Sequence, residues 1–232
     1  MATTHPWWRP NKTRPRSSNI MFAYRHFVVI RWLCDRLRAW GIFHWSVSGV
    51  ENLPPAGTPF VMVVNHIRWH DMLTIAGTIP LTHIPHWLAK AELFMPLSSW
   101  WFRGMQAIPV KRGQNDTGAI DAAVATLRQG NIMIVFPEGH RSGNGQLQKG
   151  RGGAMRMALR AGVSIVPVAI QGVEKGLRSP IAIAYGKPWL PVSQSGVDDI
   201  DPTEMTALTD DMMCHIAAML PAEYHGYYAG RV

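Results

Sequence analysis

The sequence predicts a single layered α/β domain with a mostly parallel or mixed β-sheet flanked by helices, preceded by a basic amphipathic helix. Short apolar runs rich in Val and Ile alternate with stretches of helical periodicity, a pattern typical of α/β folds. The chain has 232 residues and is 47% hydrophobic, enough for one large domain or one domain with a short appendage. We divide it into a tail (1–18), an amphipathic helix (19–44) and the main domain (45–232).

The tail is polar, basic and interrupted by three prolines, so we expect a flexible segment without regular structure. Trp7 and Trp8 are its aromatic residues. Residues 1–40 contain eight Lys and Arg and one acidic residue, whereas the rest of the chain is nearly neutral. The formal net charge of +8 therefore lies mostly in the N-terminal arm.

From about Asn19 to Trp40 the pattern becomes helical. Its apolar stripe is formed by Ala23, Phe27, Ile30, Cys34 and Leu37. Arginines and further aromatic residues fall outside the stripe, as in helices that lie at a bilayer interface beside anionic headgroups. The residues expected to contact a membrane are Trp7, Trp8, Arg25, Arg31, Trp32, Arg36, Arg38 and Trp40. Packing on the domain and nucleic-acid binding are the alternatives, but no nucleic-acid motif accompanies the charge, so we expect no nucleic-acid partner.

We expect a peripheral or monotopic protein on the cytoplasmic face of the membrane. The longest run without charged residues, Met72 to Ala89, has 18 residues and is broken by prolines and histidines. Spanning a bilayer takes about 20 predominantly apolar residues. The N-terminus also lacks the short apolar core and small-residue cleavage site of a secretory signal, which favours the cytoplasmic side.

The main domain contains candidate strands bounded by Gly, Pro or Asn. They are Trp45 to Gly49, Phe60 to Val64, Ile108 to Val110, Ile132 to Phe136, Ser164 to Ile170 and Ile181 to Tyr185. The candidate helices between and after them are Asp71 to Gly77, Thr117 to Gln129, Gly152 to Ala161 and Thr203 to Met219. Asn115 or Asp116 can cap the second of these helices, and Gly130 ends it. The last has a methionine-rich stripe, which we interpret as core.

A polar turn follows the second strand, where α/β domains place reactive groups. Asn65 and His66 come directly after Val64, and Asp71 follows His66 by five residues. If a helix begins near Asp71, its carboxylate can accept the Nδ1 proton of the imidazole, which leaves the other ring nitrogen as a general base. By itself this spacing is a weak signal, because a capping aspartate and a core histidine give the same pattern.

A second strand also ends in a polar turn, at Phe136-Pro137-Glu138-Gly139-His140-Arg141-Ser142. Together the two blocks resemble the signature of the glycerolipid acyltransferase family, the PlsC-like enzymes that acylate lysophosphatidic acid and related lipids. The segment Lys90-Ala91-Glu92-Leu93-Phe94, with Pro96, Gly104 and Arg112, is similar to the middle block of the family, and Val166-Pro167-Val168 is similar to its last block. The resemblance covers roughly Trp45 to Lys187.

The resemblance implies an acyltransferase in which His66 is the general base and Asp71 orients it. The hydroxyl of a lysophospholipid acceptor, foremost 1-acylglycerol 3-phosphate, attacks the thioester of acyl-CoA or acyl carrier protein directly and gives phosphatidic acid for phospholipid biosynthesis. The residues that would bind the acceptor phosphate are Arg112, Glu138, Gly139 and Arg141. Arginine suits a phosphate because its planar fork can donate two parallel charge-assisted hydrogen bonds.

Two positions depart from the family pattern. Arg68 stands where a small polar residue is usual, and His140 stands where a threonine is usual. The site is therefore more cationic than the pattern predicts, and both residues are candidates for acceptor selection. Glycerol 3-phosphate, an amino-acid-containing lipid and a lipid glycoside are the alternative acceptors. A membrane-binding module without catalytic activity is the alternative to an enzyme.

The sequence indicates no metal and no organic cofactor. His66 and His70 have a spacing that can bind zinc on a helix, with Asp71 or Glu92 as a further ligand, but the glutamate base of the zinc proteases is missing. Cys34 and Cys214 are far apart and form no metal or disulfide spacing, so we expect buried or partly buried thiols.

Overall fold

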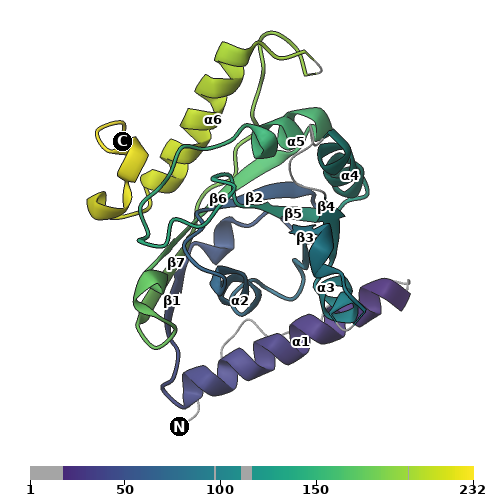
Figure 1. The fold of residues 1–232 in the computed structure, drawn as a ribbon, viewed down its shortest axis with the longest axis vertical. Helices are drawn as coiled ribbons and strands as arrows, with labels where there is room; N and C mark the ends of the chain where they lie inside the picture. The colour runs from purple at the N-terminus through teal and green to yellow at the C-terminus, as the bar shows by residue number, and fades with distance from the viewer. Residues whose placement is uncertain (1–17, 97, 111–116, 198) are drawn as a thin grey trace.

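The computed structural model describes residues 18–96, 98–110, 117–197 and 199–232. One seven-stranded sheet forms the centre of the molecule (Figure 1). Its strands are β1 (His44–Ser48), β2 (Phe60–Val64), β3 (Pro85–Lys90), β4 (Ala107–Val110), β5 (Ile132–Val135), β6 (Ser164–Gln171) and β7 (Pro180–Tyr185). The helices are α1 (Ser18–Ala39), α2 (Asp71–Ala76), α3 (Ser99–Gly104), α4 (Thr117–Arg128), α5 (Gly153–Ala161) and α6 (Pro202–Ala217).

The sheet is mixed, as predicted. Its strand order is β1-β7-β6-β2-β5-β3-β4. The five strands from β6 to β4 are parallel to one another, whereas β7 is antiparallel to β6 and carries β1 parallel to itself. The carboxyl ends of β2, β3, β4, β5 and β6 therefore open at one edge of the sheet, where ligand sites of open α/β sheets lie.

Two helical layers cover the sheet, with α1, α2 and α3 on one face and α4, α5 and α6 on the other (Figure 1). The alternation of side chains along β2 explains both cores. Phe60, Met62 and Val64 pack in the core beneath α1 and α2, whereas Val61 and Val63 pack against the helices of the other face. All five residues of β2 are fully buried, as expected for a central strand with helices on both sides.

The predicted stripe of α1 packs on the body of the protein. Ala23, Phe27 and Cys34 are fully buried, and Ile30 is nearly so. The helix ends at Ala39, so residues 40–43 form a connection to β1 instead of a continued helix. Among the described helices, none combines the length and apolar character needed to cross a membrane.

The methionine stripe of α6 is core, as predicted. Met205, Met212 and Ile216 are buried in the cluster beneath that helix. Asp201 caps α6 by accepting hydrogen bonds from the backbone N–H groups of Thr203 and Glu204. The predicted caps of α4, Asn115 and Asp116, lie outside the described residues.

One strand and one α-helix of the described residues were not predicted. The strand β3 begins at Pro85 and pairs in parallel with both β4 and β5, and its Trp87 is buried. Pro85 and His86 interrupt the apolar pattern of this segment, so the sequence did not indicate a strand there. The helix α3 has only six residues and carries adjacent tryptophans, so it shows no helical periodicity. The free thiols match the prediction, because Cys34 is buried and Cys214 is partly buried.

Candidate functional site

The site begins where β2 ends. The amide side chain of Asn65, which is buried, donates to the carbonyl oxygen of Ile170 and accepts from the N–H of the same residue, both at 2.8 Å. This two-way contact fixes the end of β2 against β6. It also determines where the next residue, His66, leaves the sheet.

The structure brings His66 and Asp71 into direct contact. The imidazole Nδ1 lies 2.8 Å from Oδ2 of Asp71, which is the first residue of α2 and is fully buried. The same oxygen accepts the backbone N–H groups of Ile67 and Arg68, at 2.7 and 2.9 Å. The turn therefore wraps around the carboxylate. An aspartate on Nδ1 directs the Nε2 lone pair outward, as a general base requires.

An aromatic ring supports the imidazole from one side. The rings of His66 and Phe136 are stacked, with centroids 4.0 Å apart and an angle of 22° between their planes. Trp87 of β3 lies behind Phe136 with its centroid 6.4 Å away. Phe136 belongs to the second motif, but the motif alone indicated no role for it. Its position beside His66 depends on β2 and β5 being neighbours in the sheet.

Glu138 joins two loops of the site. Its Oε1 accepts the N–H of His66 at 2.7 Å, and its Oε2 accepts the N–H of Gln148 at 3.0 Å. Burial raises the pKa of the Glu138 carboxyl to about 7, against the lowering effect of these two hydrogen bonds and with a smaller contribution from Asp71. The sequence did not predict this linking position, and contact of Glu138 with a phosphate stays a prediction.

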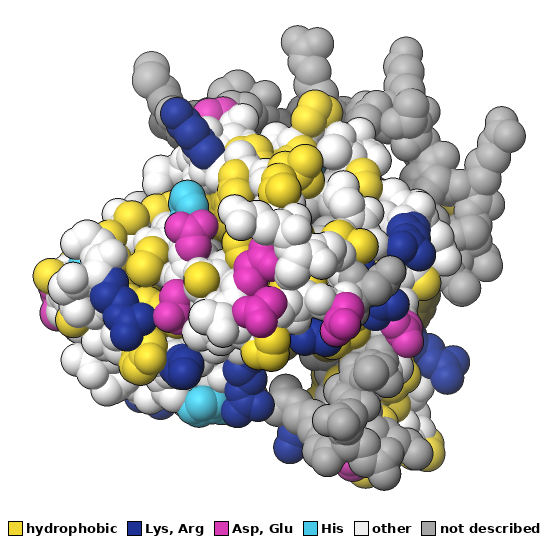
Figure 2. All heavy atoms as spheres, turned by 90° about the horizontal axis from the view of Figure 1, so that it is seen from above, with side chains coloured by type: hydrophobic (Ala, Val, Ile, Leu, Met, Phe, Trp, Pro, Cys, Tyr) yellow, Lys and Arg dark blue, Asp and Glu magenta, His cyan; other side chains and the backbone are white. Residues whose placement is uncertain are grey.

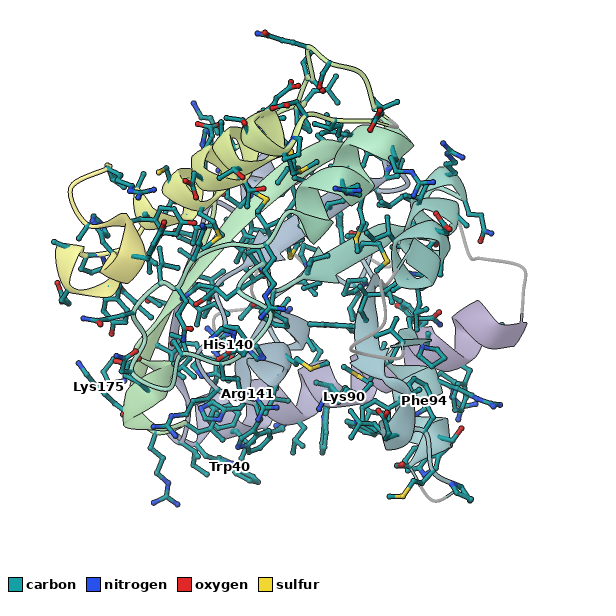
Figure 3. All side chains as sticks on the ribbon, turned by 45° about the horizontal axis from the view of Figure 1, so that its top comes forward. Trp40, Lys90, Phe94, His140, Arg141 and Lys175 are labelled. Atoms are coloured by element: carbon teal, nitrogen blue, oxygen red, sulfur yellow. The ribbon has the colours of Figure 1, made fainter. Side chains whose placement is uncertain are left out.

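The loop after β5 lies against the turn after β2. The N–H of Ser142 donates to the carbonyl of His66 at 2.8 Å, and the N–H of Gly143 donates to that of Ile67 at 3.2 Å. These contacts bring Arg141 next to the turn that carries Arg68, and both side chains are exposed. His140 is also exposed, and Figure 3 shows it close to Arg141 on the same loop. Arg112 lies outside the described residues.

Arg151 is a cation of the site that the sequence reasoning missed. Its side chain lies over Gly139, where the nearest guanidinium atom, Nε, would be 2.8 Å from any Cβ at that position. Gly139 has φ +77°, so the absence of a side chain provides both the turn and the space. The backbone N–H of Arg151 donates to the carbonyl of Pro137. No motif spacing signals this contact, because it depends on the path of the intervening loop.

His66 and His70, the pair with a zinc-binding spacing, contact different groups in the structure. His66 faces Asp71, whereas His70 is buried with its Nε2 3.3 Å from the carbonyl oxygen of Val173. Within the described ranges, no group of three His, Cys, Asp or Glu side chains is arranged to hold a metal ion.

The predicted membrane-contact residues of α1 and Trp40, directly after it, fall into two groups. Trp32 and Trp40 are exposed by 58% and 70%, and the guanidinium of Arg36 lies over the Trp32 ring. Arg25 is exposed as well. Arg31 and Arg38 instead turn toward the body, where they contact Asp35 and the carbonyl oxygens of Ile79 and Trp45, respectively. Trp7 and Trp8 lie outside the described residues.

An exposed apolar surface continues from α1 onto α3. We call it the aromatic face; it consists of Phe22, Val29 and Leu33 of α1, Trp40 directly after α1, and Trp100 and Trp101 of α3, all exposed by 42–70%. The residues of α1 recur at helical spacing. The ring of His26 joins the two helices, since it contacts Phe22, Trp100 and Trp101. The view in Figure 2, from the side of α6, instead shows basic and acidic side chains interspersed.

The chain resembles known acyltransferases. The acyltransferase family model, described as "Acyltransferase", matches residues 44–171. A chloroplastic 1-acyl-sn-glycerol-3-phosphate acyltransferase of Arabidopsis thaliana is 28% identical over 155 residues, covering 66% of this chain and 42% of the relative. A lyso-ornithine lipid O-acyltransferase of Pseudomonas aeruginosa is 34% identical over 142 residues, covering 60% and 52%. A 1-acyl-sn-glycerol-3-phosphate acyltransferase of Bacillus subtilis is 33% identical over 134 residues, covering 56% and 64%.

The matched segment thus spans roughly half the length of these relatives. Among solved structures, the 1-acyl-sn-glycerophosphate acyltransferase PlsC of Thermotoga maritima superposes with a TM-score of 0.62. The sequences are 23% identical, and the superposition covers 88% of this chain and 84% of that one. At this identity the likeness supports the fold.

Proposed function

The chain belongs to the acyltransferase family, whose model covers more than half of it, and we propose that it transfers a fatty acyl group from a thioester to the hydroxyl of a lysophospholipid. One observation carries the proposal. Within the matched region, the Nδ1 atom of His66 contacts the buried carboxylate of Asp71 at 2.8 Å, at the carboxyl edge of the parallel strands. A histidine held in this way is suited to remove a proton from a hydroxyl.

In the proposed reaction, Nε2 of His66 takes the proton of the acceptor hydroxyl as the oxygen attacks the thioester carbonyl carbon. The new C–O bond forms, the C–S bond breaks, and the thiol leaves with the proton that His66 returns. Asp71 stabilises the imidazolium formed on the way. The donor is acyl-CoA or acyl carrier protein, and the reaction uses no metal or organic cofactor.

The preferred acceptor is 1-acylglycerol 3-phosphate, which would give phosphatidic acid. Arg141 follows the Gly139 turn by two residues, the side chain of Arg151 lies over Gly139, and Arg68 lies on the adjoining turn. Among the described residues, none of these arginines has a carboxylate partner within ion-pair distance. Unpaired guanidinium groups beside a general base favour an anionic acceptor. Arg112 would add to them.

A lyso-ornithine lipid is the second candidate acceptor. It is favoured by the identity of 34% to the Pseudomonas aeruginosa enzyme, the highest of the three relatives compared above. The departures at Arg68 and His140 also fit a changed headgroup.

Purified protein incubated with acyl-CoA and a panel of acceptors tests these proposals. The panel contains 1-acylglycerol 3-phosphate, glycerol 3-phosphate, a lyso-ornithine lipid and a lysoglycolipid. We expect acyl transfer to the first, and preference for another member would reassign the acceptor. If no acceptor is acylated and no thioester is consumed with either CoA or acyl carrier protein as carrier, the protein is a membrane-binding module instead.

We further propose that the protein acts on an anionic membrane surface, at the cytoplasmic side. The aromatic face supports this, because tryptophans are favoured at the boundary of headgroups and acyl chains, and arginines beside them attract anionic lipids. Arg25 and Arg36 of α1 and Arg103 of α3 are exposed basic residues on the two helices that carry this face. Trp100 and Trp101 extend the predicted contact beyond α1.

A further inference from the structure

The segment after α6 lies outside the region matched by the family model, yet it contacts the loop that follows the second motif. The backbone of Leu147 is held from both sides. Its N–H donates to the carbonyl of Tyr224 at 2.8 Å, and its carbonyl accepts the N–H of Tyr227 at 2.9 Å. The side chain of Leu147 is buried in the core. The C-terminal segment is therefore fastened to the middle of this loop.

Two tyrosine hydroxyls of this segment are also hydrogen-bonded, that of Tyr228 to the loop and that of Tyr224 to the turn after β6. The hydroxyl of Tyr228, a fully buried residue, accepts the N–H of Gly150 at 2.9 Å and donates to Asp210 at 3.0 Å. The hydroxyl of Tyr224 accepts the N–H of Gly172, after β6, and donates to Glu174 at 2.6 Å. Burial raises the pKa of both phenols, that of Tyr224 to about 12, so both remain protonated donors at neutral pH.

At Gly145 the loop packs closely on the ring of Tyr224. A Cβ on Gly145 would lie 2.7 Å from the ring of Tyr224. Gly145 has φ +88°, which a residue with a side chain rarely adopts. The loop between residues 145 and 151 is therefore shaped by the tyrosines on one side.

On its other side the same loop touches the site. The N–H of Gln148 donates to Glu138, whose second oxygen accepts the N–H of His66. Arg151, directly after Gly150, lies over Gly139. A continuous series of contacts thus runs from Tyr228 through the loop and Glu138 to His66.

We propose that the C-terminal segment is a positioning clamp for the reaction, in which Tyr228 and Tyr224 hold the loop that, through Glu138, holds His66. The two tyrosines are positioning residues, since neither contacts the reacting atoms. The proposal rests on the proposed function only in its kinetic readout, because the contacts themselves can be measured without turnover.

The kinetic test uses the full chain with Tyr228→Phe, which removes one hydroxyl and keeps the ring. Misplacement of a catalytic group by a fraction of an ångström is costly, so we expect kcat to fall about tenfold. The KM for acyl-CoA should stay within about twofold, as the hydroxyl is not part of a donor site. The matched control is Tyr227→Phe, which keeps the ring contacts with Arg231 and with Lys149 of the loop and removes a hydroxyl that, unlike that of Tyr228, has no hydrogen bond to residues 145–151. Its kcat should be that of the wild type.

A double-mutant cycle with Glu138→Gln shows whether the two residues act through one series of contacts. We expect the effects of Tyr228→Phe and Glu138→Gln on kcat to be clearly less than multiplicative, whereas Tyr227→Phe and Glu138→Gln should combine independently. Independent effects of Tyr228 and Glu138, or equal losses in the Tyr227 control, would overturn the clamp.

Hydrogen exchange provides the readout that needs no substrate. In Tyr228→Phe, the amides of Gln148, Gly150 and His66 should exchange at least about tenfold faster, while those of α4 stay unchanged. Unchanged exchange at all three amides would refute the proposal. If the wild-type protein transfers no acyl group, the proposed function fails, and exchange still decides on the clamp. If Tyr228→Phe does not fold, Asp210→Asn, which weakens the same hydroxyl contact, replaces it in both measurements.

Discussion

The imidazole of His66 is stacked on the ring of Phe136, with centroids 4.0 Å apart. The contact joins the turn after β2 to the motif after β5, and it limits the orientations open to the imidazole. Replacement by leucine keeps an apolar side chain but removes the flat surface. We expect Phe136→Leu to lower kcat about tenfold with little change in the KM for the acceptor. Steady-state kinetics check this, with Phe94→Leu as the control because its ring packs on Phe102 instead.

Removal of the proposed base should be far more severe. A general base contributes about 10² to 10⁴ in rate, so His66→Ala should lower kcat by that factor. Asp71→Asn should also lower kcat by at least about 100-fold, because an amide cannot stabilise the imidazolium. Thermal unfolding of both variants should show a folded protein. A His66→Ala protein with unimpaired turnover would disprove the mechanism.

The raised pKa of Glu138 predicts a pH-dependent stability. Its pKa is about 7 in the folded protein and 4.5 without perturbation. The folded state therefore binds the proton of Glu138 more tightly than the unfolded state does. The stabilisation of the folded state that results is fully present below pH 4.5 and is lost as the pH rises through about 7. The difference of about 2.5 between these pKa values corresponds to about 3 kcal/mol. We expect Glu138→Gln to flatten the fall in unfolding free energy between pH 5 and 8, measured by urea titration. An identical slope in the variant would contradict this.

Arg151 should act on acceptor binding. A hydrogen bond to a charged group contributes about 1.5 to 3 kcal/mol, so Arg151→Ala should raise the KM for 1-acylglycerol 3-phosphate about 10- to 100-fold. Lysine should restore only part of the affinity, as it lacks the planar fork. The control is Arg156→Ala, since Arg156 is an exposed arginine of α5. If Arg156→Ala raises the KM equally, the effect of Arg151→Ala reflects the loss of one positive charge anywhere on the surface, and Arg151 has no specific role in acceptor binding.

The aromatic face can be tested without deleting α1, whose buried stripe belongs to the core. We expect the double change Trp100→Ala and Trp101→Ala to weaken binding to vesicles of phosphatidylglycerol and phosphatidylcholine at least about tenfold in sedimentation assays. Leu190→Ala with Val192→Ala is the matched control, because both side chains are exposed, by 60% and 71%, outside α1 and α3. Equal losses in both pairs would refute the assignment.

The sequence predicted best those parts of the site that depend on local geometry. His66 and Asp71 are five residues apart, so a strand followed by a turn and a helix is sufficient to bring them together. The strand β2 was predicted with its observed bounds, because a central strand is apolar on both faces.

The parts that escaped prediction depend on contacts between distant segments. The two carboxylate oxygens of Glu138 accept hydrogen bonds from the backbone of His66 and Gln148, which are 72 and 10 residues away in the sequence. Arg151 reaches Gly139 only because the loop between them returns to the turn. The periodicity of a sequence predicts helices and strands but not the course of a loop. A single sequence therefore gives no sign that Arg151 differs from other exposed arginines.

The burial of Ala23, Phe27 and Cys34 makes α1 part of the same rigid body as the sheet. Such a helix cannot act as a tether of variable length. On a bilayer, the aromatic face would set the depth and tilt of the whole domain, and with them the height of His66 above the lipid. Substrates that diffuse in the plane of the membrane would then meet the imidazole at one fixed level, which converts a search in three dimensions into one in two.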